Sequence, residues 1–148
     1  MDSLEGYVSD DDLAIGPLQD RGWDVSTVSW RDRSVDWNDF DIVVLRTTWD
    51  YQNQPDEFLS VLRAIDSSKA RLENPLSLVE WNLDKRYLGD LERRGIPVVP
   101  TLWGNGRFSE LELAEWQNAF GVTELILKPT VSATAQNTFR VHSYDPNI

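Results

Sequence analysis

Cysteine is absent from the sequence, and His142 is its only histidine. Without cysteine the chain forms no disulfide, no thiolate metal site and no cysteine nucleophile. A single histidine likewise excludes metal centres that are built from several histidines. These absences remove the commonest routes to a structural metal site and to thiol catalysis.

Positive charge is also scarce. The chain has 14 lysine and arginine residues against 25 aspartate and glutamate residues, for a formal net charge of −11. This balance disfavours nucleic acids and anionic membrane surfaces as partners, although it leaves room for a local basic pocket. No apolar run approaches the roughly 20 residues of a membrane span, and the acidic N-terminus does not resemble a signal peptide. We expect a cytoplasmic protein, and the sequence carries no signal for its oligomeric state.

Predicted helices and strands alternate along the chain, which is typical of α/β proteins. Helices are expected over 9–21 (with Pro17 either kinking the helix or marking its first turn), 54–66, 83–95 and 109–121; strands are expected over 23–30, 40–46, 124–128 and 138–144, and a short strand or extended segment over 96–103. The continuous β-branched run in 40–46 indicates a strand buried on both faces. We therefore predict an α/β fold with a mostly parallel sheet in its first half.

The start of the chain does not fit this pattern. An open α/β sheet normally begins with a buried strand, whereas residues 1–12 read "MDSLEGYVSDDD". We expect the usual first strand to be missing, because the gene start is placed too late, because the chain was trimmed, or because the strand is dispensable.

The segment "ELILKPTVSATAQNTFRV", residues 124–141, places Lys128 at the end of an apolar strand. Open α/β folds bind ligands at this end of the sheet, and the loop that follows offers hydroxyls and backbone N–H groups to an anion. The pattern also fits a strand-end lysine whose ammonium simply reaches water. Lys85, on the predicted helix over 83–95, taken alone fits a solvated helix residue best.

The stretch "RTTWDY", residues 46–51, directly follows the predicted buried strand. Loops at the carboxyl ends of parallel strands commonly hold substrates. Arg46 is suited to bidentate pairing with a carboxylate or phosphate, and Trp49 and Tyr51 are suited to walling a pocket. The alternative is a loop that only caps the next helix and covers the sheet edge.

Asp10, Asp11 and Asp12 form a short acidic run. Neighbouring carboxylates suggest a metal site, but they equally favour a helix N-terminus, where the dipole attracts negative charge. We adopt the second interpretation and predict no metal ligand in this chain.

Three segments, taken in order, resemble the ATP-grasp superfamily. They read "FDIVVLRTTWDYQNQPDEFLSVL", "RLENPLSLVEWNLDKRYLGDLERRGIPVVPT" and "LILKPTVSATAQNTFRV". The resemblance extends from about residue 11 to residue 141. It points to the branch that includes glutathione synthetase-like proteins and the cyclo-ligase of cycloserine biosynthesis, and it is most specific from "NPLSLVEWNLDKRYL" through "GIPVVPT" to "LKP".

This resemblance implies a domain organisation and a chemistry. Residues 1–73 are expected to form a substrate-side, Rossmann-like pre-ATP-grasp domain, and residues 74–148 the N-terminal part of an α+β ATP-grasp domain. Members of the superfamily join a carboxylate to an amine: ATP phosphorylates the carboxylate, and a nucleophile attacks the acyl phosphate. The implied ligands are ATP, Mg²⁺ and a small-molecule carboxylate or amine substrate.

The resemblance also assigns residues to this site. It implies that Lys85 and Lys128 reach the ATP phosphates, where lysines act as point charges, and that Ser132 lies in the loop that closes over them. Many members have glycines where this loop reads "SATAQ", so tight backbone wrapping is not expected here.

On the substrate side, the resemblance places Arg46, Trp49 and Tyr51 where the N-terminal domain faces the substrate. The superfamily's adenine-binding strand, ribose-binding acid and Mg²⁺ ligands follow the "KP" strands, beyond this sequence. We therefore expect a truncated ATP-grasp protein without ligase activity of its own, since the carboxylates that bring Mg²⁺ to the phosphates are lacking. Catalytic residues stay unidentified.

Two other interpretations compete with this one. A receiver-type signalling domain also has repeated βα units and a lysine–proline pair at its last strand, as in "GVTELILKPT". Such a domain needs an aspartate at the end of its third strand, where this chain has Arg46. A non-catalytic binding module on the same fold stays open, and ATP affinity distinguishes it from a nucleotide site.

Overall fold

The computed structural model describes residues 9–142 and divides the chain into two compact units, Met1–Leu83 and Asp84–Ile148. The sequence predicts a domain boundary after residue 73, and that assignment stays a prediction. Most of the segment in which a first strand is expected, residues 1–8, lies outside the described residues. Across residues 9–142, none of the helices is both long enough and apolar enough to cross a lipid bilayer.

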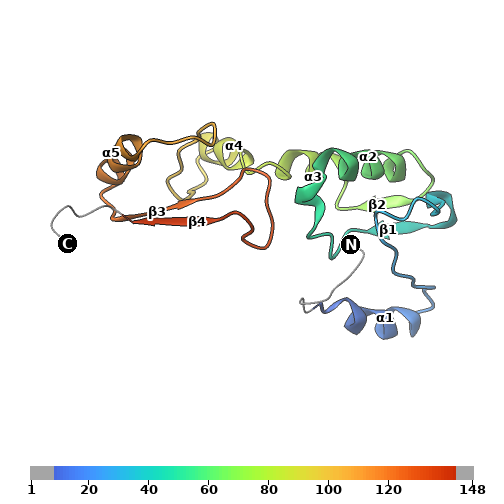
Figure 1. Cartoon of the computed structure of the whole chain (residues 1–148). Helices are drawn as coiled ribbons and strands as arrows, with labels where there is room; N and C mark the ends of the chain where they lie inside the picture. Colours follow the sequence, from blue (N-terminus) through green and yellow to red (C-terminus); the bar gives the residue numbers. More distant parts are fainter. Residues whose placement is uncertain (1–8, 143–148) are drawn as a thin grey trace. The chain divides into compact units, whose positions relative to one another are not determined.

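The first unit combines helices with a short parallel sheet (Figure 1). Its elements are α1 (Asp11–Gln19), η1 (Trp37–Asp39), β1 (Ile42–Val44), η2 (Tyr51–Asn53), α2 (Pro55–Asp66), β2 (Arg71–Glu73) and α3 (Leu76–Asn82). Strands β1 and β2 are parallel, with Val43 opposite Leu72. The predicted α/β class and the parallel pairing are confirmed.

Helix α2 provides the core of this unit. Pro55 occupies its first turn together with Asp56 and Glu57, as expected where free N–H groups and the helix dipole favour proline and acids. Its apolar face is Phe58, Leu62 and Ile65, all buried, and the core is completed by Trp30 and Leu72. The helix predicted over 54–66 is therefore confirmed.

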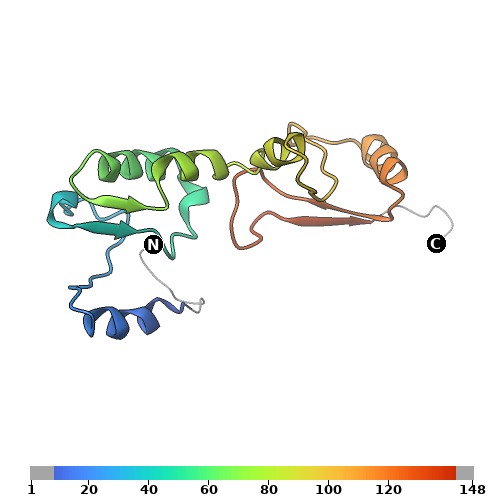
Figure 2. The same cartoon turned by 180° about the vertical axis from the view of Figure 1, so that it is seen from behind.

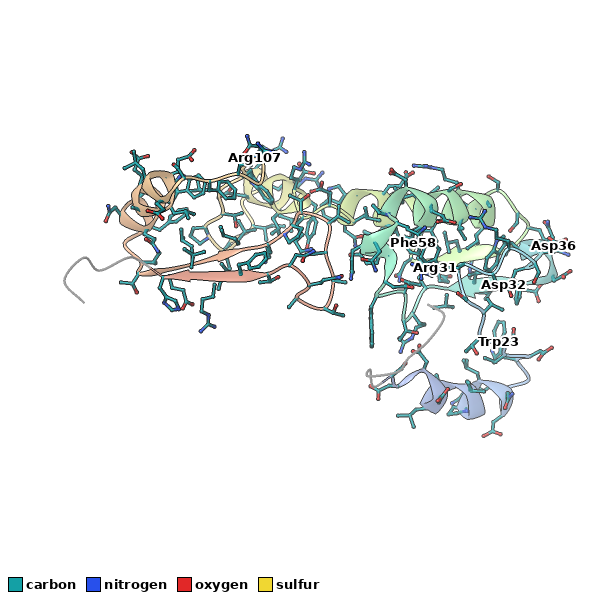
Figure 3. All side chains as sticks on the ribbon, in the orientation of Figure 1. Trp23, Arg31, Asp32, Asp36, Phe58 and Arg107 are labelled. Carbon is teal, nitrogen blue, oxygen red and sulfur yellow. The ribbon has the colours of Figure 1, made fainter. Side chains whose placement is uncertain are left out.

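Aromatic contacts hold Phe58 in place. The Phe58 ring meets Trp30 edge-on at 5.3 Å and stacks on Tyr51 at 5.5 Å, distances at which aromatic pairs attract. Figure 3 shows Phe58 pointing from α2 toward the strands. These contacts attach the loop after β1 to the core.

Two strand predictions for this unit are wrong. Residues 23–30 alternate polar and apolar side chains but form no strand, and Val28 is 42% exposed. Figure 3 shows Trp23 directly after α1, at the start of this irregular segment. The strand over 40–46 exists only as β1, and it is not buried on both faces, because Val44 is 56% exposed. Alternation alone does not make a strand when the described sheet has only two members to pair.

The second unit contains α4 (Tyr87–Arg93), α5 (Glu110–Phe120), β3 (Glu124–Leu127) and β4 (Phe139–His142). Strands β3 and β4 are antiparallel, with Leu125 opposite Val141, and a loop of eleven residues between Leu127 and Phe139 joins them (Figure 2). Residues 96–103 are irregular, so of the two predicted alternatives the extended segment holds.

Both ends of α5 follow the sequence signals. The Ser109 side chain accepts from the Glu112 N–H, the Glu112 side chain accepts from the Ser109 N–H, and Gly121 ends the helix at φ 65°. This reciprocal cap satisfies two N–H groups that the helix leaves unpaired, and a left-handed glycine closes the other end. The predicted helix is confirmed, and it leads directly into β3.

Candidate functional site

Lys85 lies in the turn before α4, not on the helix that the sequence predicts. Its backbone N–H donates to the Thr130 carbonyl at 2.8 Å. Its ammonium donates to both the carbonyl and the hydroxyl of Ser132, each at 2.7 Å, and lies 3.5 Å from the Thr130 carbonyl. Helix α4 begins only at Tyr87, with Arg86 as its N-cap, so Lys85 precedes the helix and is bonded to the β3–β4 loop instead.

The β3–β4 loop is stabilised by its own hydrogen bonds. The Ser132 hydroxyl donates to the Pro129 carbonyl at 3.2 Å, and turn bonds join Gln136 to Ala133 and Thr138 to Ala135. The loop therefore presents Ser132 to Lys85 in a fixed place.

The same loop adopts the left-handed backbone without glycine. Thr134, Ala135 and Asn137 have φ of 53°, 57° and 54°. This conformation is costly for residues with a Cβ, by roughly 1–2 kcal/mol each, and it recurs at ligand-binding loops. The loop thus makes a tight turn although "SATAQ" contains no glycine. The sequence did not indicate this turn.

Lys128 directly follows β3, and its positive charge is felt at Lys85. Burial lowers the pKa of Lys85 below its ordinary value, repulsion from the Lys128 ammonium lowers this pKa further, and the Asp84 carboxylate opposes both effects. Two lysine ammonium groups this near one another form a local cationic site in an acidic protein. Such a site attracts an anion.

Asp84 is tied to the same loop, since its carboxylate accepts from the Thr130 hydroxyl at 3.2 Å. It also lies 3.1 Å from the Arg86 guanidinium. The structure thus brings together Lys85 and Ser132, which the sequence singled out, with Asp84 and Thr130, which it did not. No local pattern marks these two, because their contact joins positions 46 residues apart.

In the first unit, Arg46 pairs with a carboxylate of the protein itself. Its Nε donates to Asp11 Oδ1 at 2.8 Å, and the Thr47 hydroxyl donates to Asp11 Oδ2 at 2.7 Å. The Thr47 hydrogen bond and, to a lesser extent, Arg46 lower the pKa of Asp11 below its ordinary value, against the opposing effect of burial. Asp11 therefore has a specific partner, in addition to its place in the first turn of α1.

A cavity of about 230 Å³ opens beside this pair, at the ends of β1 and β2. Its polar lining comes from Arg46, Thr48, Tyr51, Asn74 and Asn82. Its apolar lining comes from Leu45, Phe58, Leu78, Val79 and Leu83.

The structure places the three predicted substrate-side residues differently. Arg46 and Tyr51 line the cavity, whereas Trp49 is not part of its lining. Asn74 and Asn82, which do line it, were missed by the sequence analysis. Asn74 adopts the left-handed conformation at φ 60°, which asparagine tolerates, but the proline that follows it favours an extended backbone, so the sequence carried no signal for this conformation.

No group of three or more histidine, cysteine, aspartate or glutamate side chains within residues 9–142 is arranged to hold a metal ion. The Nε2 atom of His142, the single histidine, lies 3.4 Å from the Glu124 carboxylate across the β3–β4 pair.

Known proteins are similar to this chain in sequence and in fold. The family model described as "D-cycloserine synthetase DcsG, N-terminal domain" matches residues 1–74. The "Cycloserine biosynthesis protein DcsG" of Streptomyces lavendulae is 46% identical over 72 residues, which cover 49% of this chain and 24% of that protein.

A solved structure, "Crystal structure of D-cycloserine synthetase DcsG", matches over both units. Its TM-score is 0.78 at 30% sequence identity, and the match covers 90% of this chain and 46% of that chain. The chain thus spans less than half the length of the relatives that it matches.

Proposed function

The chain belongs to the family of the D-cycloserine synthetase DcsG N-terminal domain, and we propose that it carries the substrate-side domain and the first half of the nucleotide site of an ATP-grasp-type ligase. Such a ligase activates a carboxylate as an acyl phosphate. An amine, or a nucleophile of the same molecule when a ring is closed, then displaces the phosphate. Similarity to a solved D-cycloserine synthetase supports a relation to cycloserine synthesis, and the acyl-phosphate route is what the ATP-grasp resemblance implies.

The contact between Lys85 and the β3–β4 loop carries the nucleotide half of the proposal. The ammonium lies 2.7 Å from two oxygens of Ser132 and close enough to Lys128 for the two charges to repel. Because the two ammonium groups repel one another, their arrangement is less stable without an anion than with an anion bound between them. A polyphosphate provides that anion.

ATP is the nucleotide that this resemblance implies, and the residues fit its phosphates. Lys85 and Lys128 would hold phosphate oxygens, and Ser132 would donate its hydroxyl proton to another. When bound, ATP supplies the phosphoryl group that activates the carboxylate. We propose that Mg²⁺ accompanies it, and we assign no metal ligand among residues 9–142.

The first unit is proposed to face the substrate through Arg46, Trp49 and Tyr51. Arg46 and Tyr51 line the cavity at the ends of the parallel strands, where α/β proteins commonly bind small molecules. Trp49 belongs to the same loop and stays a proposed substrate-side residue.

A calorimetric titration of the intact chain with ATP tests this proposal. The wild type is expected to bind ATP, and Lys85→Ala and Lys128→Ala are each expected to weaken binding by about ten-fold or more, because each removes a charge-assisted contact to phosphate. Lys69→Ala is the matched control, since Lys69 is the one other lysine of the sequence and lies in the other unit.

The control should bind like the wild type. No heat of binding in the wild type, or equal losses in all three variants, would refute the nucleotide site and favour a non-catalytic module. A titration in the presence of EDTA separates the lysine contacts from those of a metal, and the lysine contribution should persist there.

A further inference from the structure

The sequence contains three lysines, and Lys85 differs from the other two in its surroundings. Lys69 and Lys128 are exposed, whereas Lys85 is half-buried in the turn before α4. Its Nζ lies 2.7 Å from both side-chain and backbone oxygens of Ser132, and 3.5 Å from the Thr130 carbonyl. These contacts fix the position of the Lys85 nitrogen atom.

The contacts of Lys85 suit a neutral amine as well as an ammonium. A neutral amine keeps two N–H groups, which match the carbonyls of Ser132 and Thr130, and it gains a lone pair. The Ser132 hydroxyl then donates to the Pro129 carbonyl at 3.2 Å, and the lone pair is left open toward solvent. No atom of the site has to move for Lys85 to act as a nucleophile.

The environment of Lys85 also favours the neutral form. Burial and the Lys128 ammonium lower the pKa of Lys85, and the Asp84 carboxylate opposes them only in part. At pH 8 an ordinary lysine, with a pKa of 10.5, is neutral in about one molecule of 300. Only that fraction attacks a carbonyl carbon, so Lys85 is expected to react faster than the exposed Lys69.

The second ammonium selects the kind of reagent. The charge of Lys128 acts on Lys85, so an anion that binds Lys128 lies close to the Lys85 nitrogen. An acyl phosphate carries both groups that this pair of lysines recognises, a phosphate for Lys128 and an electrophilic carbonyl carbon for Lys85. A neutral ester carries only the second group.

We propose that Lys85 is a modification site for acyl phosphates, with Lys128 binding the phosphate of the reagent. The Lys85 nitrogen attacks the carbonyl carbon, a C–N bond forms, and the C–O bond to phosphate breaks. The phosphate leaves with the bonding electrons and accepts the proton that the nitrogen loses. The products are an amide at Lys85 and inorganic phosphate, and the step needs no other reactant.

Acylation changes what Lys85 contributes to the site. The amide is uncharged and keeps a single N–H, which suffices for the Ser132 carbonyl but not for a phosphate ligand. The acylated chain should therefore bind ATP about ten-fold more weakly, as expected for Lys85→Ala. This consequence rests on the proposed function, whereas the acylation itself does not.

The test incubates the intact chain with acetyl phosphate at pH 8 and follows the acetylation of each lysine by mass spectrometry of peptides. Lys85 should be acetylated at least about three-fold faster than Lys69, which is an internal reference in the same molecule. Unfolding the chain in guanidinium chloride should make the two rates alike, because burial and the neighbouring charge are lost. p-Nitrophenyl acetate, which lacks phosphate, should show a smaller preference for Lys85.

Lys128→Ala is the decisive variant, and Lys69→Ala is its matched control, since each removes one positive charge. Lys128→Ala should slow the acetylation of Lys85 by acetyl phosphate about three-fold or more, and Lys69→Ala should leave it unchanged. Thermal unfolding followed by tryptophan fluorescence shows whether each variant is folded. Inorganic phosphate tests the same point in the wild type, where it should slow the acetylation of Lys85 but not that of Lys69.

Two results would overturn the inference. One is equal acetylation of Lys85 and Lys69 in the folded wild type. The other is acetylation of Lys85 that neither inorganic phosphate nor the folded Lys128→Ala variant slows. Both are independent of the ATP titration: a chain that is acetylated at Lys85 but never binds ATP keeps this site and loses the proposed nucleotide site.

Discussion

Lys85 illustrates how one side chain links fold and function. Its ammonium joins the turn before α4 to the β3–β4 loop, and its pKa is lowered by burial and by Lys128. A lysine with a lowered pKa binds fewer protons in the folded protein than in the unfolded chain. Stability therefore rises with pH between the lowered value and the ordinary 10.5.

ATP binding should depend on pH through the same residue. A bound polyphosphate opposes both burial and repulsion, so it raises the pKa of Lys85, and binding takes up protons near the lowered pKa. ATP affinity should therefore fall as pH rises through the pKa of the free protein. Calorimetry in two buffers with different ionisation enthalpies measures this proton uptake.

Lys85→Arg is the control for this prediction, because arginine stays protonated throughout. The variant should bind ATP without proton uptake. Equal uptake by Lys85→Arg and the wild type would assign the titration to another group.

At the residue scale, the sequence indicated the two lysines as candidates but not their contacts. Lys128 stands at the end of an apolar strand, and the resemblance placed Lys85, so both were predicted before their surroundings were known. Asp11 was interpreted only as a helix-start residue, since its contact with Arg46 spans 35 positions. Contacts at such separations leave no local pattern in a sequence.

At the element scale, local signals succeeded where each element carries its own boundary. Helix α5 has a capping box at Ser109 and a left-handed glycine at its end, and α2 has its buried apolar residues at helical spacing. The segment 23–30 has only an alternation of apolar and polar residues, and such a segment forms a strand only where a neighbouring strand pairs with it. The predicted strand failed there because no such neighbour pairs with it within the described residues.

Leu62 should carry a large share of the stability of the first unit. It is fully buried on α2, so Leu62→Ala removes apolar contacts and leaves a cavity, and it should lower the free energy of unfolding by about 2–5 kcal/mol. Leu13→Ala on α1 is the control, since Leu13 is 73% exposed. Urea unfolding followed by tryptophan fluorescence measures both, and a comparable loss in the two variants would contradict the core described here.

At the scale of the whole molecule, the net negative charge opposes the binding of ATP at the proposed nucleotide site. The chain carries a formal charge of −11, and ATP is itself strongly anionic, so long-range electrostatics oppose their encounter. Salt at physiological strength screens this repulsion beyond about 8 Å, whereas contacts within the site are screened much less. The proposed binding of ATP therefore rests on the local pair of lysines, not on the field of the protein.

The whole molecule also defines the limit of sequence reasoning. The α/β class and the relation to a protein of cycloserine biosynthesis could be predicted from ordered motifs, and the match to the solved relative covers 90% of this chain. The cavity of the first unit could not be predicted, because its lining comes from β1, β2, α2 and α3 together and depends on how they pack.

The most direct test of the nucleotide site compares ATP with adenosine on the intact chain at physiological ionic strength. If Lys85 and Lys128 bind the polyphosphate, ATP should bind about 100-fold more tightly than adenosine, and the Lys85→Ala/Lys128→Ala double variant should bind the two ligands alike. Equal affinities in the wild type, or a preference for ATP that survives in the double variant, would contradict it.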